Sequence, residues 1–153
     1  MLAEKPSDRQ IVLSRKFAAA RAQVFAALTQ QEHLLRWMQP SKMPLVAAEV
    51  DLRVGGSFRY TFARPSGKKL EVRGAYSRVE EPAGFAYRES YDFSPLEIEV
   101  ETRLEADGES TLFRQTLTYA SQADRDEDFP GVAESSADVY AKLESYLAAM
   151  QSL

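Results

Sequence analysis

The chain has no cysteine, and His33 is its single histidine. Without cysteine it can form neither a disulfide nor a thiolate metal site, and one histidine excludes any site that needs two imidazoles. The lack of cysteine is compatible with the reducing cytoplasm. We therefore predict a cytoplasmic protein that uses no metal and no cofactor.

Long apolar runs and an excess of positive charge are also missing. No stretch approaches the roughly 20 apolar residues of a membrane-spanning helix, and the first ten residues lack the apolar segment of a signal peptide. The formal net charge of −4 argues against a nucleic-acid-binding surface. No P-loop, dinucleotide fingerprint, nucleophile elbow or metal-ligand spacing occurs. These absences favour a binding protein over an enzyme.

The length of 153 residues fits one domain, and we find no internal repeat or linker. Residues 1–9 are polar, and we predict that they form a flexible N-terminal segment. Residues 10–153 are predicted to form a single domain.

The middle of the chain alternates between apolar and polar residues, which is typical of strands with one dry and one wet face. Turn signals lie at 66–67, 81–84, 94–95 and 107–108. The same alternation at residues 10–17 predicts a first strand. The alternating residues predicted to face inward are Phe58, Tyr60, Phe62, Val72, Gly74, Tyr76, Tyr87, Glu89, Tyr91, Phe93, Leu96, Ile98, Val100, Thr102, Leu104, Phe113, Gln115, Leu117 and Tyr119.

Three segments have helical spacing instead. Residues 18–29 and 31–38 predict two short helices, and apolar residues from Val132 to Met150 recur at intervals of three and four. The last pattern predicts a long amphipathic helix whose apolar stripe needs the dry face of the sheet. The predicted fold class is therefore α+β: a curved antiparallel sheet of about six or seven strands around a long C-terminal helix, with the two short helices between strands one and two.

A glycine pair stands between two alternating stretches, in the run Asp51-Leu52-Arg53-Val54-Gly55-Gly56-Ser57-Phe58. Glycine there indicates a tight turn or a close approach of two strands. Asp51 and Arg53 share a parity beside this turn, and we expect them to form an ion pair that fixes it.

Residues 10–150 resemble a known family. The resemblance is carried by this glycine run together with Arg15, Phe17, Val24-Phe25, Trp37 and the strand at 112–116. The chain is similar to homologues of the activator of heat-shock protein 90 ATPase, in the START-like (SRPBCC) superfamily that includes the birch-pollen allergen. The resemblance implies a helix-grip fold with a cavity between sheet and long helix. Such cavities bind hydrophobic small molecules in many relatives, some relatives are cyclases or hydrolases, and others bind a chaperone and stimulate its ATPase.

One position departs from the family pattern. Relatives commonly carry a Gly-Trp pair at the start of the long helix, where this chain has Ser135-Ser136. A serine in place of tryptophan removes a large wall from one end of the implied cavity. The ligand inferred from relatives therefore does not carry over directly.

Inward-facing aromatic residues and methionines are the candidates for lining that cavity, because rings and thioethers suit an aromatic or apolar ligand. Ordinary core packing is the alternative, above all for Trp37. The predicted cavity residues are Trp37, Met38, Met43, Phe58, Tyr60, Phe62, Tyr76, Tyr87, Glu89, Tyr91, Phe113, Gln115, Ser136 and Tyr140.

Glu89 is the one candidate for acid or base chemistry. Parity places its carboxyl between Tyr87 and Tyr91, where desolvation would raise its pKa. The alternative is a structural role, in which Glu89 pairs with an inward-facing Arg15 or lies near the open rim of the cavity.

Three other features have simple structural explanations. His33 is a poor metal ligand without a second histidine or cysteine, and surface exposure is the stronger interpretation. The acidic run 124–128 lacks the glycine of a calcium loop and is better read as the solvated start of a helix, with Ser121 as its cap. Glu97, Glu99 and Glu101 form an acidic row that solvates and protects a strand, although it could dock a basic partner.

The leading hypothesis is a protein that binds a small hydrophobic or aromatic molecule. The alternatives are a chaperone co-factor active in stress response, with the acidic row as its docking surface, and a cyclase- or hydrolase-like enzyme using Glu89. An exposed sheet edge could support a homodimer.

Overall fold

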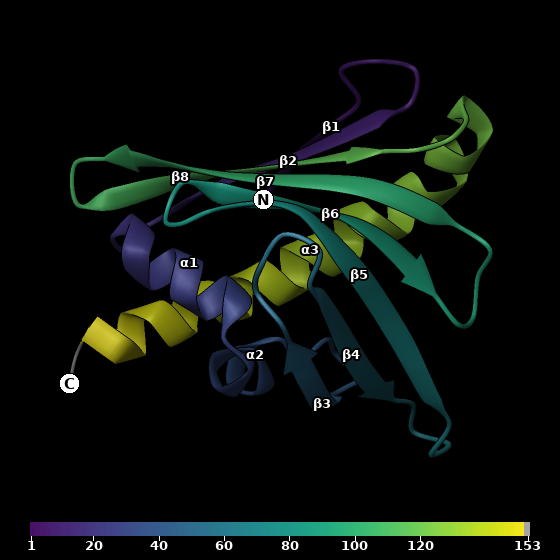
Figure 1. Ribbon diagram of the computed structural model, residues 1–153, viewed down its shortest axis with the longest axis horizontal. Helices are drawn as coiled ribbons and strands as arrows, with labels where there is room; N and C mark the ends of the chain where they lie inside the picture. The colour runs from purple at the N-terminus through teal and green to yellow at the C-terminus, as the bar shows by residue number, and fades with distance from the viewer. Residues whose placement is uncertain (152–153) are drawn as a thin grey trace.

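One antiparallel sheet and three helices make up the computed structural model, which describes residues 1–151 (Figure 1). The sheet has the spatial order β1-β2-β8-β7-β6-β5-β4-β3. The elements are β1 Leu2–Glu4, β2 Gln10–Phe17, α1 Arg21–Thr29, α2 Gln31–Trp37, β3 Leu45–Val50, β4 Ser57–Ala63, β5 Lys69–Glu80, β6 Gly84–Tyr91, β7 Glu97–Asp107, β8 Ser110–Thr118 and α3 Gln122–Gln151.

The predicted fold class is confirmed, because the curved sheet holds the long helix α3 against its concave face and α1 and α2 lie between β2 and β3 (Figure 1). The sheet has eight strands, where we expected six or seven. The strand that the sequence did not indicate is β1, within residues 1–9, which pairs with β2 from Leu2 opposite Ser14 to Glu4 opposite Val12.

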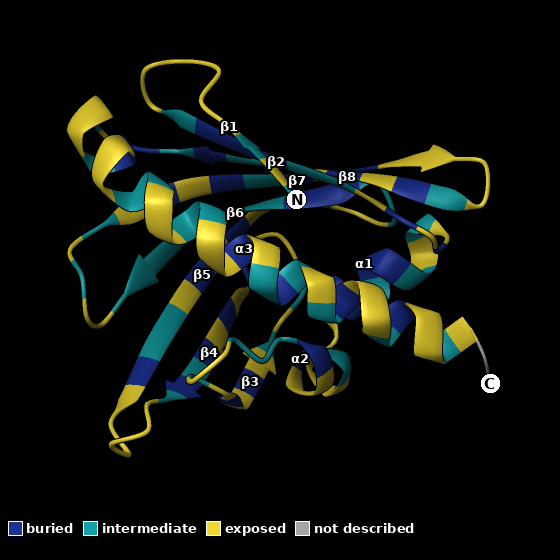
Figure 2. Cartoon of the chain, turned by 180° about the vertical axis from the view of Figure 1, so that it is seen from behind, coloured by how far each residue is buried: buried dark blue, intermediate teal, exposed yellow. Residues whose placement is uncertain are grey.

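Period-2 alternation sorts the side chains onto two faces of the sheet. In β7, Ile98, Val100 and Leu104 are buried on the concave side, and the glutamates between them face outward. The same division appears along α3, where buried and exposed bands alternate (Figure 2). Burial of both apolar faces against each other is the main contribution to stability.

The glycine pair forms a tight turn between β3 and β4, as the sequence predicts. Gly55 has a φ of +84°, a conformation that side-chain-bearing residues rarely adopt. A Cβ on Gly56 would lie 2.2 Å from the Asp51 carbonyl oxygen. The Gly55 amide donates to the Tyr76 carbonyl oxygen at 3.0 Å, which ties the turn to β5. The expected ion pair is present, with 3.0 Å between Arg53 Nε and Asp51 Oδ2.

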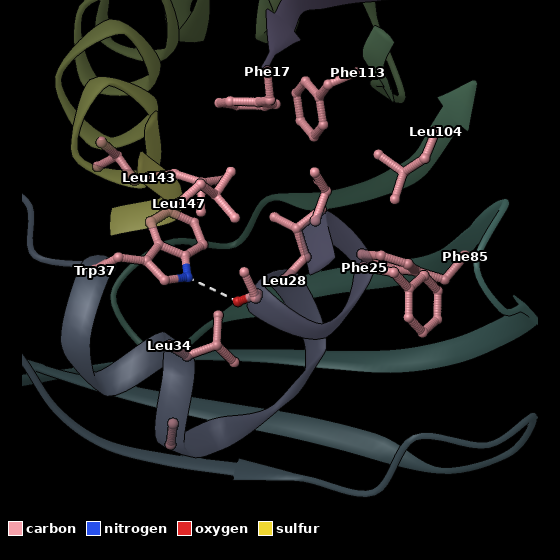
Figure 3. Packing of buried hydrophobic residues seen from close by; sticks show 14 of the residues in the cluster. Phe17, Phe25, Leu28, Leu34, Trp37, Phe85, Leu104, Phe113, Leu143 and Leu147 are labelled. Atoms are coloured by element: carbon pink, nitrogen blue, oxygen red, sulfur yellow. Dashed lines mark hydrogen bonds between the residues drawn. The ribbon is translucent and has the colours of Figure 1, made fainter. Parts of the chain in front are cut away.

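Trp37 lies in the main core, 2% exposed, where α1, α2 and α3 meet. Its indole N–H donates to the Ala27 carbonyl oxygen at 2.7 Å, so its one polar group is satisfied (Figure 3). Leu143 and Leu147 of α3 pack beside it, and Phe17 and Phe113 supply the sheet side of the same core. Trp37 therefore holds the helices together.

The long helix begins at Gln122, earlier than the apolar repeat from Val132 indicates. Ser121 caps it, because its Oγ accepts a hydrogen bond from the Asp124 amide at 3.1 Å. The acidic run thus lies in the first two turns of the helix, as predicted, although Arg125 within it is buried and not solvated. Pro130 lies inside α3, and Figure 1 shows the first turns set at an angle to the rest of the helix.

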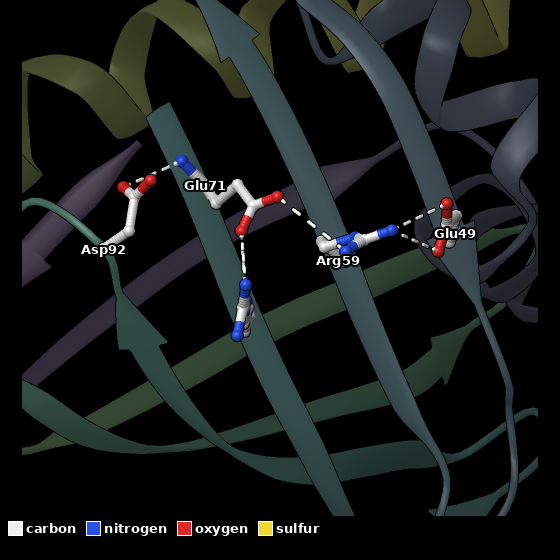
Figure 4. A network of polar contacts seen from close by, with 5 residues as sticks. Glu49, Arg59, Glu71 and Asp92 are labelled. Carbon is white, nitrogen blue, oxygen red and sulfur yellow. Dashed lines mark hydrogen bonds and ion pairs between the residues drawn. The ribbon is translucent and has the colours of Figure 1, made fainter. Parts of the chain in front are cut away.

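Ion pairs cover the convex face of the sheet. Across β3, β4 and β5, Arg59 donates to Glu49 at 3.0 Å and Glu71 accepts from Arg73 at 2.6 Å (Figure 4). The Glu71 amide donates to Asp92 Oδ1 at 3.0 Å, which links this network to the end of β6. Because the pairs are exposed, each contributes little to stability, and together they keep this face solvated.

Candidate functional site

A cleft of about 410 Å³ opens between the first half of α3 and the concave face of the sheet. This volume is within the usual range for small-molecule sites. Its walls come from α3, from the end of β6 and the segment joining it to β7, from the residues after α2, and from β2, β4 and β8. The cleft therefore lies where a helix-grip fold is expected to hold a ligand.

Six of the predicted cavity residues line this cleft. They come from five separate parts of the chain, which the fold brings together: Met38, Phe62, Tyr91, Gln115, Ser136 and Tyr140. Whether they bind a ligand stays a prediction.

The other predicted residues lie beside the cleft or in the core. Phe58, Tyr60, Tyr76 and Phe113 are buried there together with Trp37, and Met43 and Tyr87 pack partly buried against them. Phe58 stacks on Tyr60 with ring centroids 4.4 Å apart. These side chains belong to the core that the helices share with the sheet, and they do not line the cleft.

Glu89 lies two residues before Tyr91 on β6 and accepts a hydrogen bond from the Tyr91 hydroxyl. Burial raises the pKa of its carboxyl to about 7, and the charge of Asp128 adds to that rise, while the Tyr91 hydrogen bond opposes it. Arg15 does not partner Glu89, because it pairs with Glu144 of α3 at 2.8 Å. The carboxyl is thus poised between its two protonation states near neutral pH.

Hydroxyl and amide groups connect the cleft to the sheet. The Tyr140 hydroxyl donates to Gln115 Oε1 at 3.4 Å, and Gln115 Nε2 donates to Thr102 Oγ1 at 3.1 Å. The Tyr119 hydroxyl donates to Asp128 Oδ2 at 2.5 Å. Burial raises the pKa of Tyr140 above its ordinary value, so this phenol stays protonated and able to donate.

Several lining residues were not among the predicted ones. The missed positions are Leu13, Pro40, Phe93, Ser94, Leu96, Leu117, Asp128, Gly131, Val132, Ser135 and Val139. Leu13 and Leu117 share the inward parity of Gln115, with Leu13 directly opposite Gln115, so strand register could have found them. Asp128 had no such signal, because the acidic run around it is typical of a solvated helix start.

The remaining sequence candidates have structural partners. His33 is partly buried, and its Nδ1 contacts the Tyr146 hydroxyl. Glu99 pairs with Arg88 at 2.6 Å, and Glu101 pairs with Arg78 at 2.9 Å. The acidic row on β7 is therefore interleaved with cations. Within residues 1–151, no cluster of three or more potential ligand side chains could hold a metal ion, and no described helix is long and apolar enough to span a membrane.

Comparison with solved structures shows the same fold in bacterial proteins. A Rhodobacter sphaeroides protein is 26% identical with a TM-score of 0.90, over 97% of this chain and 98% of its own. A Mycobacterium smegmatis protein is 19% identical with a TM-score of 0.87, over 98% of each chain. The AHSA1-like protein from Aeromonas hydrophila is 20% identical with a TM-score of 0.66, over 88% of this chain and 93% of its own.

None of the curated proteins compared with the chain matches it. The family model described as "Activator of Hsp90 ATPase homolog 1-like protein" matches residues 18–148. That match includes the glycine turn, the Trp37 core and the α3 wall of the cleft. The chain therefore belongs to the family of Activator of Hsp90 ATPase homolog 1-like proteins.

Proposed function

We propose that this protein binds a small hydrophobic or aromatic molecule in the cleft between α3 and the sheet. The observation that carries the proposal is the lining, in which Phe62, Tyr91, Phe93 and Tyr140 surround a space of about 410 Å³. Rings supply apolar contact area, and a few hydroxyl and amide groups can orient a ligand.

Ser135 and Ser136 support this proposal from the α3 side. Both line the cleft, and Ser136 is buried. A large side chain at either position would occupy space that the serines leave open.

The test is a ligand screen by thermal shift, with native mass spectrometry of the purified protein, followed by one variant that fills the cleft. Ser135→Trp is suitable because Ser135 is exposed and the new indole can reach the cleft without displacing the core. We expect Ser135→Trp to abolish binding of any molecule found.

The control is Glu134→Trp, which adds the same side chain at an exposed neighbouring position that does not line the cleft. It should bind like the parent. Undiminished binding by Ser135→Trp would contradict the proposed site.

A chaperone co-factor in the stress response is the second candidate, favoured by the family match. Here the acidic row of Glu97, Glu99 and Glu101 would dock a basic surface after exchanging its arginine partners. The test is a pull-down with the heat-shock protein 90 of the same organism and an ATPase assay. Stimulation that is lost when the three glutamates are changed to glutamine would support this function.

An enzyme using Glu89 is the third candidate, favoured by a carboxyl pKa of about 7. Turnover that survives Glu89→Gln would dismiss it.

A cytoplasmic location and a homodimer through the sheet edges β1 or β3 belong to the proposal too. Light scattering would test the homodimer.

A further inference from the structure

The cleft carries negative charge without a matching cation. Asp128 is the one charged residue among those that line it. Glu89 stands behind Tyr91, close enough that the Asp128 charge contributes to the raised pKa of its carboxyl. Among the ion pairs of residues 1–151, none involves Asp128 or Glu89.

The nearby arginines are engaged elsewhere. Arg15 faces the concave side but pairs with Glu144 at 2.8 Å. Arg125, one helical turn before Asp128, pairs with Asp126 at 2.7 Å and donates to the Gln10 carbonyl oxygen at 3.2 Å. Neither is free to neutralise the cleft.

The aromatic walls suit a cation as well. Tyr91 and Phe93 lie with ring centroids 5.3 Å apart, and Tyr140 and Phe62 line the same cleft. The face of an aromatic ring attracts a cation, and the attraction is strongest where water is excluded. A carboxylate and several rings around one space form a favourable environment for an ammonium group.

We propose that the ligand of this cleft is an amphiphilic amine, a molecule with one protonated nitrogen on an aromatic or aliphatic body. Its ammonium lies against Asp128 and the Tyr91–Phe93 rings, and its apolar body covers Met38, Phe62 and Leu117. This inference rests on the proposed function, since it names the chemical class that the same cleft selects. Carboxylate ligands are disfavoured by repulsion from Asp128.

The test uses three probes that share one ring system: naphthylethylamine, naphthylethanol and naphthylacetate. Isothermal titration calorimetry at neutral pH gives the affinity of each. Because only the ammonium forms an ion pair with the Asp128 carboxylate, we expect the amine to bind about tenfold more tightly than the alcohol, with the acetate weakest.

Asp128→Asn tests the residue. The amide keeps the size of the side chain, and its oxygen can still accept from the Tyr119 hydroxyl. We expect this variant to bind the amine about tenfold more weakly and the alcohol unchanged. Glu127→Gln is the control, because Glu127 is exposed and lies outside the cleft. This substitution removes the same charge from the chain as Asp128→Asn does.

Each outcome decides a separate question. Equal affinity for amine and alcohol, or an Asp128→Asn variant that keeps the parent's preference, would overturn the amine inference and leave the proposed hydrophobic site standing. Failure of all three probes to bind the parent, with no molecule found in the thermal-shift and mass-spectrometry screen of the parent either, would overturn the proposed function and the inference together.

Discussion

The ionisation of Glu89 is coupled to folding, because its carboxyl lies among tyrosine rings. Burial raises the pKa of this group from its usual 4.5 to about 7. Between these two pH values the folded chain holds a proton on Glu89 that the unfolded chain has lost. The free energy of unfolding therefore falls as the pH rises through this window.

Glu89→Gln should remove this part of the pH dependence. A neutral glutamine can still accept a hydrogen bond from the Tyr91 hydroxyl, and it does not ionise. We therefore expect the variant to gain free energy of unfolding at pH 8, and this gain should exceed any gain at pH 5 by about 1 kcal/mol or more. Urea unfolding at several pH values measures it. The control Glu105→Gln removes an exposed carboxylate, and a Glu89→Gln variant with the same profile as this control would refute the prediction.

Gly74 shows how closely the strands of the concave face pack. A Cβ on Gly74 would lie 1.9 Å from Cε2 of the Phe58 ring, which is directly opposite in the register of β4 and β5. The Phe58 ring packs against Tyr60 and Tyr87, with ring centroids 4.4 and 4.9 Å away. These neighbours prevent the ring from moving aside for an added Cβ. Only a residue without a side chain fits here.

We therefore expect Gly74→Ala to lower the free energy of unfolding by about 1–3 kcal/mol, the usual effect of overpacking. Chemical denaturation measures the change. Adding Phe58→Leu should recover part of the loss, since it removes the clashing atoms. Gly131→Ala is the control, because a Cβ there meets nothing within 4 Å and alanine favours the helix. Equal losses in both alanine variants would contradict the steric explanation.

At the scale of the element, α3 depends on its first turn. Asp128 belongs to the segment before Pro130, so the cleft has its carboxylate only if the helix starts at Gln122. Ser121 secures that start through the Asp124 amide. The cap thus links local helix chemistry to the shape of the site.

Ser121→Ala should cost about 1 kcal/mol of stability, as loss of an N-cap generally does. It should also increase hydrogen exchange of the amides at 122–128 more than of those at 136–147. Mass spectrometry of deuterium uptake measures both. Ser145→Ala is the matched control at an exposed position in the last third of α3. Uniform exchange along the helix in the Ser121 variant would show that the cap does not hold the first turn.

The strands were predictable because each has one wet and one dry face, so its period is visible in the chain. The start of α3 was predictable from Ser121 and the acidic run but not from periodicity, since Pro130 and Gly131 interrupt the helical spacing of apolar residues. The strand β1 has three residues, too few to show a period. This omission comes from an element whose stability depends on its neighbour, since β1 is held by its pairing with β2.

At the scale of the whole molecule, the site was the less predictable part. Parity indicates which side chains face the concave side, but not which of them the helices cover. Phe25 of α1 packs on Phe85 with ring centroids 5.8 Å apart, and Tyr76 lies beside them. The helices α1 and α2 thus fill one half of the sheet's concave face. The cleft opens over the other half, towards Leu13, Gln115 and Leu117.

A hydrophobic core joins the three helices to the sheet, and Leu143 lies in it with no exposed surface. It packs in the cluster that contains Trp37, Phe17 and Phe113. Leu143→Ala should therefore cost about 2–5 kcal/mol. Because the helices and the sheet share this core, the fluorescence of Trp37 and the far-ultraviolet circular dichroism should shift to the same lower denaturant midpoint.

Leu112→Ala is the control for this prediction, since Leu112 is 40% exposed on β8. We expect it to lower the midpoint less than Leu143→Ala does, because the side chain it shortens is already partly in water. Two separate midpoints for fluorescence and circular dichroism in Leu143→Ala would mean that α1 and α2 unfold apart from the sheet. In that case Trp37 would report a local helical unit, and the cleft could open without global unfolding.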